Sequence, residues 1–331
     1  MAVSIEDIKK LRAMTGAGLA DVKKALTEAE GDFDKAKDLL RERGLAIAAK
    51  RSDRETSNGC VLVKKDGNFA AMVAVKCETD FVANGADFIA MVQQILDAAV
   101  AAKAQSLDEV KALKIGDQDA ASMVTQRSGI TGEKMEIDGY NFIEGENVEV
   151  YDHMNKHTLA TMVQLNQNNA EAGHKVAMQV AAMKPVALNE ESVSQATKDE
   201  ELKVAIEKTK EEQIARQVNV ALKKAGINPA HVDSEDHIES NTKKGWLTEE
   251  QAAQAREIIK TEGEKAAANL KEQMIQNIAK GRMAKFFKEN CLVDQEFQFA
   301  DGDKISVKDW LKAQDKDLAI VDYKRFTLVA D

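Results

Sequence analysis

The sequence predicts a multidomain α+β protein with an N-terminal helical bundle, a duplicated core built on antiparallel sheets, and an inserted long helical hairpin. The chain has 331 residues, which is long for one hydrophobic core. Its 2 prolines and 5% aromatic residues favour a helix-rich architecture. The hydrophobic period also changes from helical to alternating near residue 59 and back to helical near residue 190. These observations together predict several domains.

Residues 1–51 are expected to form a bundle of three short helices. Apolar residues recur at helical spacing in each, and residues 15–18 (Thr-Gly-Ala-Gly) separate the first helix from the second. A Gly-Asp pair at 31–32 precedes the third helix, which should end at Gly44 because glycine is a common C-terminal cap. A short basic helical exit follows, and then a polar linker at 52–58.

Residues 59–138 are expected to form the first core subdomain. Alternating residues on both sides of an Asp-Gly pair at 66–67 predict a β-hairpin, because this pair favours the tight turn between two strands. Residues 79–83 (Thr-Asp-Phe-Val-Ala) follow the second strand and lead into an amphipathic helix that begins near Gly85. The polar stretch 106–127 is compatible with a helix.

Residues 139–189 together with 291–331 are expected to form a second core subdomain that repeats the first. A hairpin around residues 155–156, the polar loop 166–172 and a following helix match the strand, turn, strand, loop and helix of the first copy.

The C-terminal segment is expected to complete the second sheet. Alternation predicts strands at 296–299 and 324–329, with a helix at 307–314 between them. The long helical hairpin would then be an insertion within the second subdomain.

Residues 190–290 are rich in Glu, Lys, Ala and Gln and predict two long helices joined by a loop that contains Pro229. The second helix is expected to begin at Thr248 and to continue through Ile278, and it could span about 60 Å at roughly 1.5 Å per residue. Such a hairpin cannot cover its apolar stripe alone, so a second copy of the chain is an expected partner, which would make a homodimer. The alternative is a solvated arm held only by contacts within the hairpin.

Charge and cysteine usage exclude several classes of protein. The net charge of −10 argues against sequence-independent nucleic-acid binding, because such binding needs a basic surface. Cys60, Cys77 and Cys291 are widely spaced and suit a reducing compartment. No signal segment opens the chain, and no apolar run approaches the roughly 18 residues that a membrane span needs. We therefore expect a cytoplasmic protein without direct contacts to nucleic acid or membrane.

The sequence does not predict an enzyme. His153 and His157 are spaced as H-x-x-x-H, but they flank a predicted hairpin turn rather than lying on one helix face, so we expect no metal site. No phosphate-loop, dinucleotide-binding or nucleophile-elbow motif occurs, and we expect no cofactor. An enzyme with an unrecognised site between the two core units is the weaker alternative.

The segment at residues 79–83 has two interpretations. Asp80 or Asn84 could cap the following helix while Phe81 packs its first turn onto the core. A carboxylate beside a large aromatic side chain is also suited to reach into another protein. The corresponding loop of the second repeat lacks the Asp-Phe pair. Because a structural cap would be needed in both copies, this difference favours a functional role.

The sequence resembles the elongation factor Ts family of bacterial nucleotide-exchange factors over nearly its whole length. The most specific motifs are residues 11–18 (Leu-Arg-Ala-Met-Thr-Gly-Ala-Gly) with 21–26 (Asp-Val-Lys-Lys-Ala-Leu), and residues 77–83 (Cys-Glu-Thr-Asp-Phe-Val-Ala). Weaker matches are residues 281–286 and 325–326.

The resemblance implies a ubiquitin-associated-like (UBA-like) bundle, two related α+β subdomains, a coiled-coil-like dimerisation arm, and the GTPase elongation factor Tu as partner. In this family the Asp-Phe pair enters the GTPase beside its nucleotide and disturbs Mg²⁺ and phosphate-loop contacts, so that GDP leaves. The chain would then be an exchange factor rather than an enzyme. The residues that match the family's partner contacts are Thr79, Asp80, Phe81, Val82, Lys23, Lys50, Gly132 and His153.

Some features depart from the family pattern. The arm is longer than the short form, and residues 130–131 and the position after Lys50 differ from the commonest residues. Since the chain stops at Asp331, we expect the further C-terminal helix of some members to be absent. The alternative function is a non-catalytic scaffold that binds a partner through the UBA-like bundle.

Overall fold

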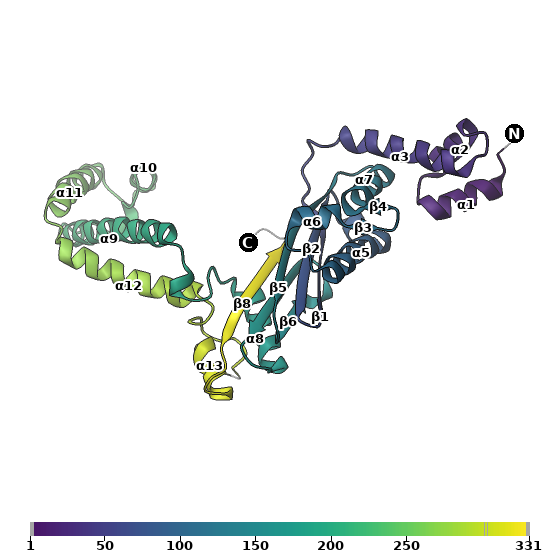
Figure 1. The fold of residues 1–331 in the computed structure, drawn as a ribbon. Coiled ribbons are helices and arrows are strands. Elements are labelled where there is room, and N and C mark those ends of the chain that lie inside the picture. The colour runs from purple at the N-terminus through teal and green to yellow at the C-terminus, as the bar shows by residue number, and fades with distance from the viewer. Residues whose placement is uncertain (1–2, 301, 303, 329–331) are drawn as a thin grey trace. The chain divides into compact units, whose positions relative to one another are not determined.

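The computed structural model describes residues 3–300, 302 and 304–328, and Figure 1 shows its helices and strands in chain order. The chain forms two compact units. One combines Met1–Leu188 with Gln295–Asp331, and the other is Asn189–Asp294. The second unit contains the arm that the sequence predicts at 190–290.

The N-terminal bundle has three helices around a small apolar core, in which Leu11, Val22 and Leu26 are fully buried. The prediction that the third helix ends at Gly44 is wrong, because this helix continues to Ala49. Gly44 is buried inside the helix, where it serves a close helix crossing and not a cap. The helices are α1 (Ile5–Thr15), α2 (Leu19–Glu28) and α3 (Phe33–Ala49).

The first core sheet has three antiparallel strands in the order β1-β2-β5. The predicted hairpin is confirmed, since Asp66 pairs with Phe69 across the turn. The strands are β1 (Asn58–Asp66), β2 (Phe69–Cys77) and β5 (Met135–Glu144).

The expected boundary between residues 138 and 139 falls inside β5, which pairs with β2 from Met135 to Glu144. All of β5 therefore belongs to the first sheet, and the first subdomain extends further than expected. A register shift opposite Ala74 and Val75 interrupts the alternation of β5 at this point. For this reason the alternating pattern did not predict β5 as a strand.

Helices cover one face of the first sheet (Figure 1). The helix predicted near Gly85 is confirmed as α5 (Ala86–Ala102), which buries Phe88, Ile95 and Leu96 in the core. The stretch 106–127 is not a single helix, because a small β-hairpin interrupts it. Its elements are α6 (Leu107–Ala112), β3 (Lys114–Ile115), β4 (Gln118–Asp119) and α7 (Ala120–Thr131).

The second core sheet has the strand order β6-β7-β8, also antiparallel. The helix expected at 307–314 is confirmed as α13, and the C-terminal strand is confirmed as β8, although Val329 lies outside the described residues. The elements are β6 (Val148–Asp152), β7 (Leu159–Leu165), α8 (Ala170–Met183), α13 (Val307–Gln314) and β8 (Ile320–Thr327).

The strand expected at 296–299 is wrong. Only an isolated bridge joins Glu296 to Ser306, and the Phe297 amide donates a hydrogen bond to the Ile305 carbonyl at 2.9 Å. The Phe297 ring packs on Trp310 of α13, with ring centroids 4.4 Å apart. The alternating aromatic residues therefore pack onto a helix instead of forming a strand of the sheet.

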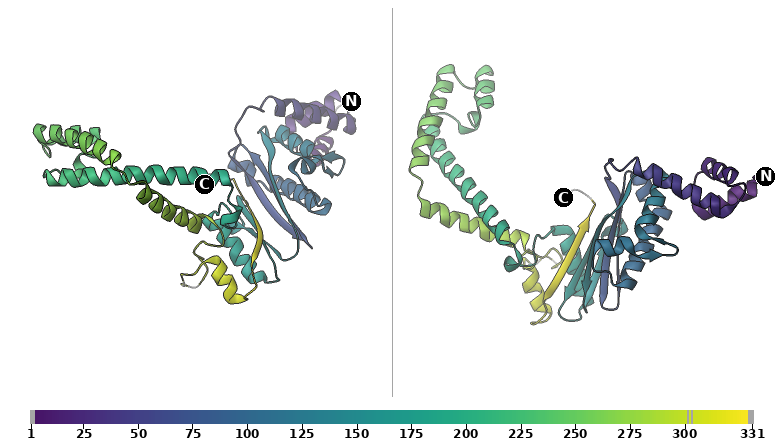
Figure 2. Two further views of the ribbon diagram at one scale, coloured as in Figure 1. Left: turned by 60° about the vertical axis from the view of Figure 1, so that its left-hand side comes forward. Right: turned by 45° about the horizontal axis from the view of Figure 1, so that its top comes forward.

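The predicted duplication is confirmed by topology, because each sheet places its third strand beside the second strand of its hairpin. The two sheets pack on each other through apolar residues such as Met72, Ile143 and Met162. Figure 2 shows the C-terminal strand β8, in yellow, running beside the other strands of its unit. Close contact between the sheets requires Gly139, where an added methyl carbon would lie 2.0 Å from the Phe326 ring.

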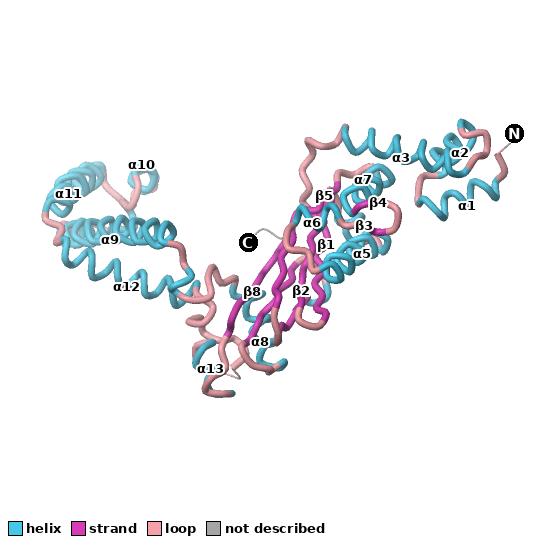
Figure 3. The backbone as a smooth tube through the Cα atoms, in the orientation of Figure 1, coloured by secondary structure: helices cyan, strands magenta, loops and turns pink. Residues whose placement is uncertain are grey.

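The second unit is entirely helical in its regular elements (Figure 3). Val218 and Leu222 of its longest helix pack with Ala252 and Ala255 in a shared apolar cluster. Within the described part of the chain, none of the helices has the length and apolar character that a membrane crossing requires. The helices are α9 (Gln195–Lys224), α10 (Glu235–Lys243), α11 (Glu249–Ala268) and α12 (Glu272–Asn290).

The prediction of one unbroken helix from Thr248 through Ile278 is wrong. The predicted cap is present, since the Gln251 amide donates to the Thr248 hydroxyl at 3.0 Å, but the helix ends at Ala268. Asn269 follows it, and its side-chain amide donates to the Lys265 carbonyl at 2.8 Å, which satisfies a carbonyl group at the end of the helix. Both α11 and α12 contact α9, so the break lets two shorter helices pack on one long helix.

Candidate functional site

The segment after β2 forms a short turn of helix, α4 (Asp80–Ala83), that points an aromatic side chain into solvent. Phe81 is 88% exposed, whereas Phe88 of the next helix is fully buried. The interpretation in which Phe81 packs the helix onto the core is therefore wrong. We call residues 79–84 the Phe81 turn.

The Phe81 turn is held by its own backbone and by the residues behind Phe81. The Thr79 hydroxyl accepts a hydrogen bond from the Val82 amide at 3.4 Å and so caps α4. The Asn84 side-chain amide donates to the Asp80 carbonyl at 2.9 Å. Val82 packs against the core, and Ala83 is buried in it. Asp80 is exposed and Gly85 precedes α5, so neither Asp80 nor Asn84 caps that helix.

The second repeat has no such turn between β7 and α8. There, Asn169 directly caps α8 by accepting a hydrogen bond from the Ala172 amide at 3.0 Å. The duplicated fold therefore connects its hairpin to its helix without an exposed aromatic residue. This comparison supports the inference from the sequence that the Phe81 turn is not required by the fold.

Two carboxylates fix the base of the Phe81 turn. Glu133, after α7, accepts hydrogen bonds from the Thr79 amide at 3.0 Å and from the Thr79 hydroxyl at 2.6 Å. Glu78 accepts a hydrogen bond from the Lys134 amide at 2.6 Å and one from Arg54 at 3.0 Å. The Lys134 amide, together with Arg54, holds the pKa of Glu78 below its usual value, so this carboxylate stays charged.

Gly132 and Arg51 come together beside this base. Gly132 ends α7 with a φ of 75°, a left-handed conformation that glycine adopts without strain. Arg51, next to Lys50, places a guanidinium nitrogen 3.2 Å from the position of a methyl carbon built at Gly132. Lys50 itself is exposed at the end of α3. The structure thus places Gly132 directly before Glu133, which binds the Phe81 turn, and brings the Arg51 guanidinium beside Gly132.

His153 lies in a short 3-10 helix (His153–Asn155) that follows β6. Its Nδ1 atom is 3.1 Å from the Tyr151 hydroxyl, whereas the His157 Nδ1 atom is 2.5 Å from a carboxylate oxygen of Asp152. The two histidines therefore contact different groups. Among residues 3–300, 302 and 304–328, no set of three or more histidine, cysteine or acidic side chains is arranged to hold a metal ion.

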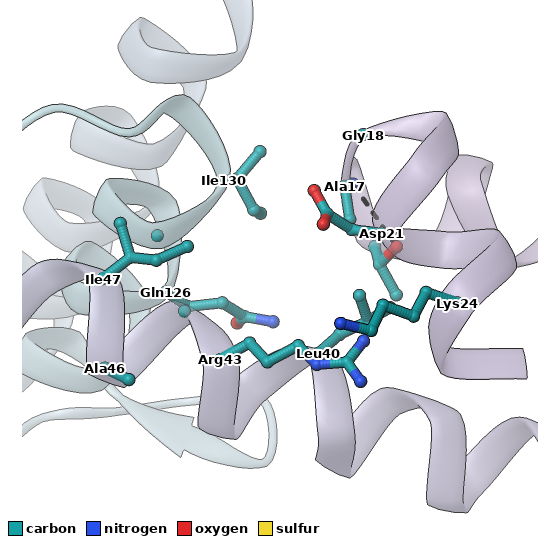
Figure 4. A pocket seen from close by; sticks show the side chains of 13 residues that line it. Ala17, Gly18, Asp21, Lys24, Leu40, Arg43, Ala46, Ile47, Gln126 and Ile130 are labelled. Carbon is teal, nitrogen blue, oxygen red and sulfur yellow. Dashed lines mark hydrogen bonds between the residues drawn. The ribbon is translucent and has the colours of Figure 1, made fainter. Parts of the chain in front are cut away.

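Lys23 is exposed on α2, apart from the residues that line the pocket between the bundle and α7. In Figure 4, Asp21 and Lys24 face this pocket from the bundle, and Gln126 and Ile130 face it from α7. The bundle and the core are therefore not packed together along their whole boundary. α3 and α7 cross closely at Gly44 and Gly129.

The cysteines do not offer a nucleophile. Burial raises the pKa of Cys60 to about 12, and burial also raises that of Cys77 to about 12. Cys291 is buried as well, and desolvation raises its pKa to about 11. Since the thiolate is the reactive form, these side chains stay unreactive at neutral pH.

Sequence reasoning missed Glu133, Glu78 and the crossing of Gly44 with Gly129. Glu133 follows Gly132 directly, but its partner Thr79 is 54 positions away, and no local pattern indicates such a contact. Gly129 lies in a helical segment, where a glycine costs stability and so often marks close packing. That glycine is a signal in the sequence that could have indicated the crossing.

Comparison with known proteins identifies the family. The family model for Elongation factor TS matches residues 78–330. Elongation factor Ts of Phocaeicola vulgatus is 57% identical over 331 residues, and that of Bacteroides fragilis is 58% identical over 332 residues, with 100% of both chains covered in each case. Elongation factor Ts of Porphyromonas gingivalis is 38% identical over 333 residues, again with full coverage. The chain therefore belongs to the elongation factor Ts family of translation elongation factors.

Proposed function

We propose that this protein promotes GDP release from the GTPase elongation factor Tu by inserting Asp80 and Phe81 near the nucleotide and its Mg²⁺ ion, and that it catalyses no bond-making reaction itself. The observation that carries the proposal is the exposed Phe81 side chain on an anchored turn. Because its backbone is already fixed, the turn loses less conformational entropy on binding than a flexible loop would.

The physical basis of exchange is linkage between two binding equilibria. A protein that binds the nucleotide-free GTPase more tightly than the GDP-bound form must weaken GDP binding by the same factor. Burial of a phenylalanine side chain contributes about 1.5–3 kcal/mol, which corresponds to a factor of roughly ten to a hundred. Phe81 can supply this preference if its site in the partner is open only when the nucleotide contacts are broken.

Asp80 has a different role in the proposal. Its carboxylate is exposed beside Phe81 at the first position of α4, so it can act as a polar anchor while the ring enters the partner. Mg²⁺ and the nucleotide phosphates are the largest charges in a GTPase site, so disturbing them weakens GDP binding most. Lys23, Lys50, Gly132 and His153 are proposed as surrounding contacts.

Release of a fluorescent GDP analogue from purified elongation factor Tu tests the proposal. We expect the wild-type chain to accelerate release, Phe81→Ala to lose most of the acceleration, and Asp80→Ala to lose less. Val321→Ala is a matched control, because Val321 is a 50% exposed apolar residue on β8 of the same unit. No acceleration by the wild-type chain refutes the exchange function. Full activity of Phe81→Ala refutes the insertion mechanism.

We also propose that a second copy of the chain covers apolar residues of the arm. Val204 and Val220 on α9 and Met274 on α12 are each 36–44% exposed. Sedimentation of the wild-type chain and of a Val204→Lys, Val220→Lys variant tests this. Concentration-dependent dimers in the wild type alone support the proposal, and a wild-type monomer at all concentrations contradicts it.

A further inference from the structure

The pairing of β2 with β5 ends at Cys77 and Met135, two positions before the Phe81 turn begins at Thr79. The next positions in this register are Glu78 opposite Lys134 and Thr79 opposite Glu133. The structure shows side-chain hydrogen bonds at both positions. The Lys134 amide donates to the Glu78 carboxylate, and the Thr79 amide donates to the Glu133 carboxylate. Each segment thus satisfies a backbone N–H group of the other with a carboxylate, an arrangement that we call the carboxylate clasp.

We infer that Glu133 is a positioning residue, which holds the Phe81 turn in its binding conformation through the carboxylate clasp. The inference rests on the proposed function of Phe81, which it deepens. The Thr79 hydroxyl connects the two, because it donates to Glu133 at 2.6 Å and accepts from the Val82 amide at 3.4 Å. One chain of hydrogen bonds therefore runs from Glu133 to the helical turn that carries Phe81.

Glu133 is itself fixed on both sides. Its carbonyl accepts a hydrogen bond from the Ser128 hydroxyl at 2.5 Å, and its amide donates to the Thr131 hydroxyl at 3.3 Å. Both partners belong to α7, which packs on β5 and crosses α3. The position of the Phe81 turn is thereby tied to the same helix that contacts the N-terminal bundle.

A role in sheet stability alone does not account for this geometry. The strands are already paired through nine residues of β2, from Phe69 to Cys77, without Glu133. The carboxylate of Glu133 instead binds both donor groups of Thr79, the residue that caps α4. Hydrogen bonds to a charged acceptor are about twice as strong as neutral ones, so Glu133 is well suited to order a short exposed turn.

Hydrogen–deuterium exchange of the free protein tests the inference without the partner. In Glu133→Ala, the backbone amides of residues 79–84 should exchange faster by about tenfold or more, the factor expected for loss of charge-assisted hydrogen bonds. Glu133→Gln keeps the size of the side chain and should give a smaller increase. Glu146→Ala is the matched control, since Glu146 is exposed just beyond the other end of β5. Unchanged exchange at residues 79–84 in Glu133→Ala overturns the inference.

A double-mutant cycle on GDP release then asks whether Glu133 acts through Phe81. We expect Glu133→Ala to reduce the acceleration by about tenfold in the wild-type background and to add little in the Phe81→Ala background. Equal effects in both backgrounds overturn the positioning role, because they mean that Glu133 acts elsewhere. If the wild-type chain does not accelerate release, the proposed function fails, and faster exchange at residues 79–84 in Glu133→Ala still supports the clasp.

Discussion

The crossing of α3 and α7 predicts different outcomes for two glycines that face each other. A methyl carbon built at Gly129 would lie 2.2 Å from the Gly44 Cα atom, whereas one built at Gly44 would lie 3.6 Å from the Gly129 Cα atom. Carbon atoms pack at about 3.5–4.0 Å, so an alanine at 129 must push the helices apart by roughly 1 Å or more. Gly129→Ala should loosen the bundle from the core, and Gly44→Ala should not.

The expected change in the free energy of unfolding is the sum of two opposing contributions. Overpacking lowers the free energy of unfolding by about 1–3 kcal/mol, and replacing a glycine inside a helix by alanine raises it by up to about 1 kcal/mol. The helical gain is common to both variants, so Gly129→Ala should be less stable than Gly44→Ala by about 1–3 kcal/mol. Gly281→Ala in α12 isolates the helical gain, because nothing lies within 4 Å of its added methyl carbon.

Urea unfolding measures these differences, and limited trypsin digestion locates them. Cleavage at Arg54 in the linker, and at Arg51 directly before it, should be faster in Gly129→Ala than in Gly44→Ala, because a loosened bundle exposes the linker. Equal unfolding midpoints and equal cleavage rates for the two variants would refute the reasoning. The close crossing would then not hold the bundle on the core.

Three further predictions follow from exposure and charge. Phe81→Ala should change the free energy of unfolding by less than about 0.5 kcal/mol, because an exposed side chain contributes little to stability; a larger loss in urea unfolding contradicts this. Cys60 and Cys77 should resist alkylation by iodoacetamide at pH 8 until urea unfolds the protein. Burial raises the pKa of both thiols from 9.0 to about 12 in the folded state. Their contribution to the free energy of unfolding is therefore complete below pH 9 and is lost as pH rises toward 12. Glu78, with a folded pKa below 4.5, stabilises the protein above about pH 4.5 and loses this effect as pH falls through its folded pKa. The stability difference between wild type and Glu78→Gln should therefore shrink in acid, and a constant difference from pH 6 to 3 argues against the assignment.

Local patterns predicted most of the core. The Asp-Gly turn at 66–67, the helix after Gly85 and the duplicated hairpins follow from turn chemistry and hydrophobic period, and the structure confirms them. These signals are contained within a few neighbouring residues. The elements that sequence reasoning placed wrongly depend instead on distant partners. In the sequence, Gly44 has the pattern of a helix cap, and only the folded structure shows that it lies against Gly129.

The arm and the segment at 296–299 show the same limit. The apolar pattern from Thr248 to Ile278 fits one helix, but packing of two helices on α9 favours a break at Asn269. Alternating aromatic residues at 296–299 fit a strand, but the Phe297 ring packs on Trp310 of α13 instead of on a sheet. Of the candidate site, the Phe81 turn was predictable from its loss in the second repeat. Its support by Glu133 was not, because Glu133 and Thr79 are 54 positions apart in the sequence.

The affinity of this protein for nucleotide-free and for GDP-bound elongation factor Tu tests the central claim most directly. Titration calorimetry of both forms gives the preference, which must equal the factor by which the protein weakens GDP binding. We predict tighter binding to the nucleotide-free form and a preference reduced by about tenfold or more in Phe81→Ala, since the ring is the side chain that becomes buried. Equal affinities for the two forms, or a preference that Phe81→Ala leaves unchanged, would contradict the account.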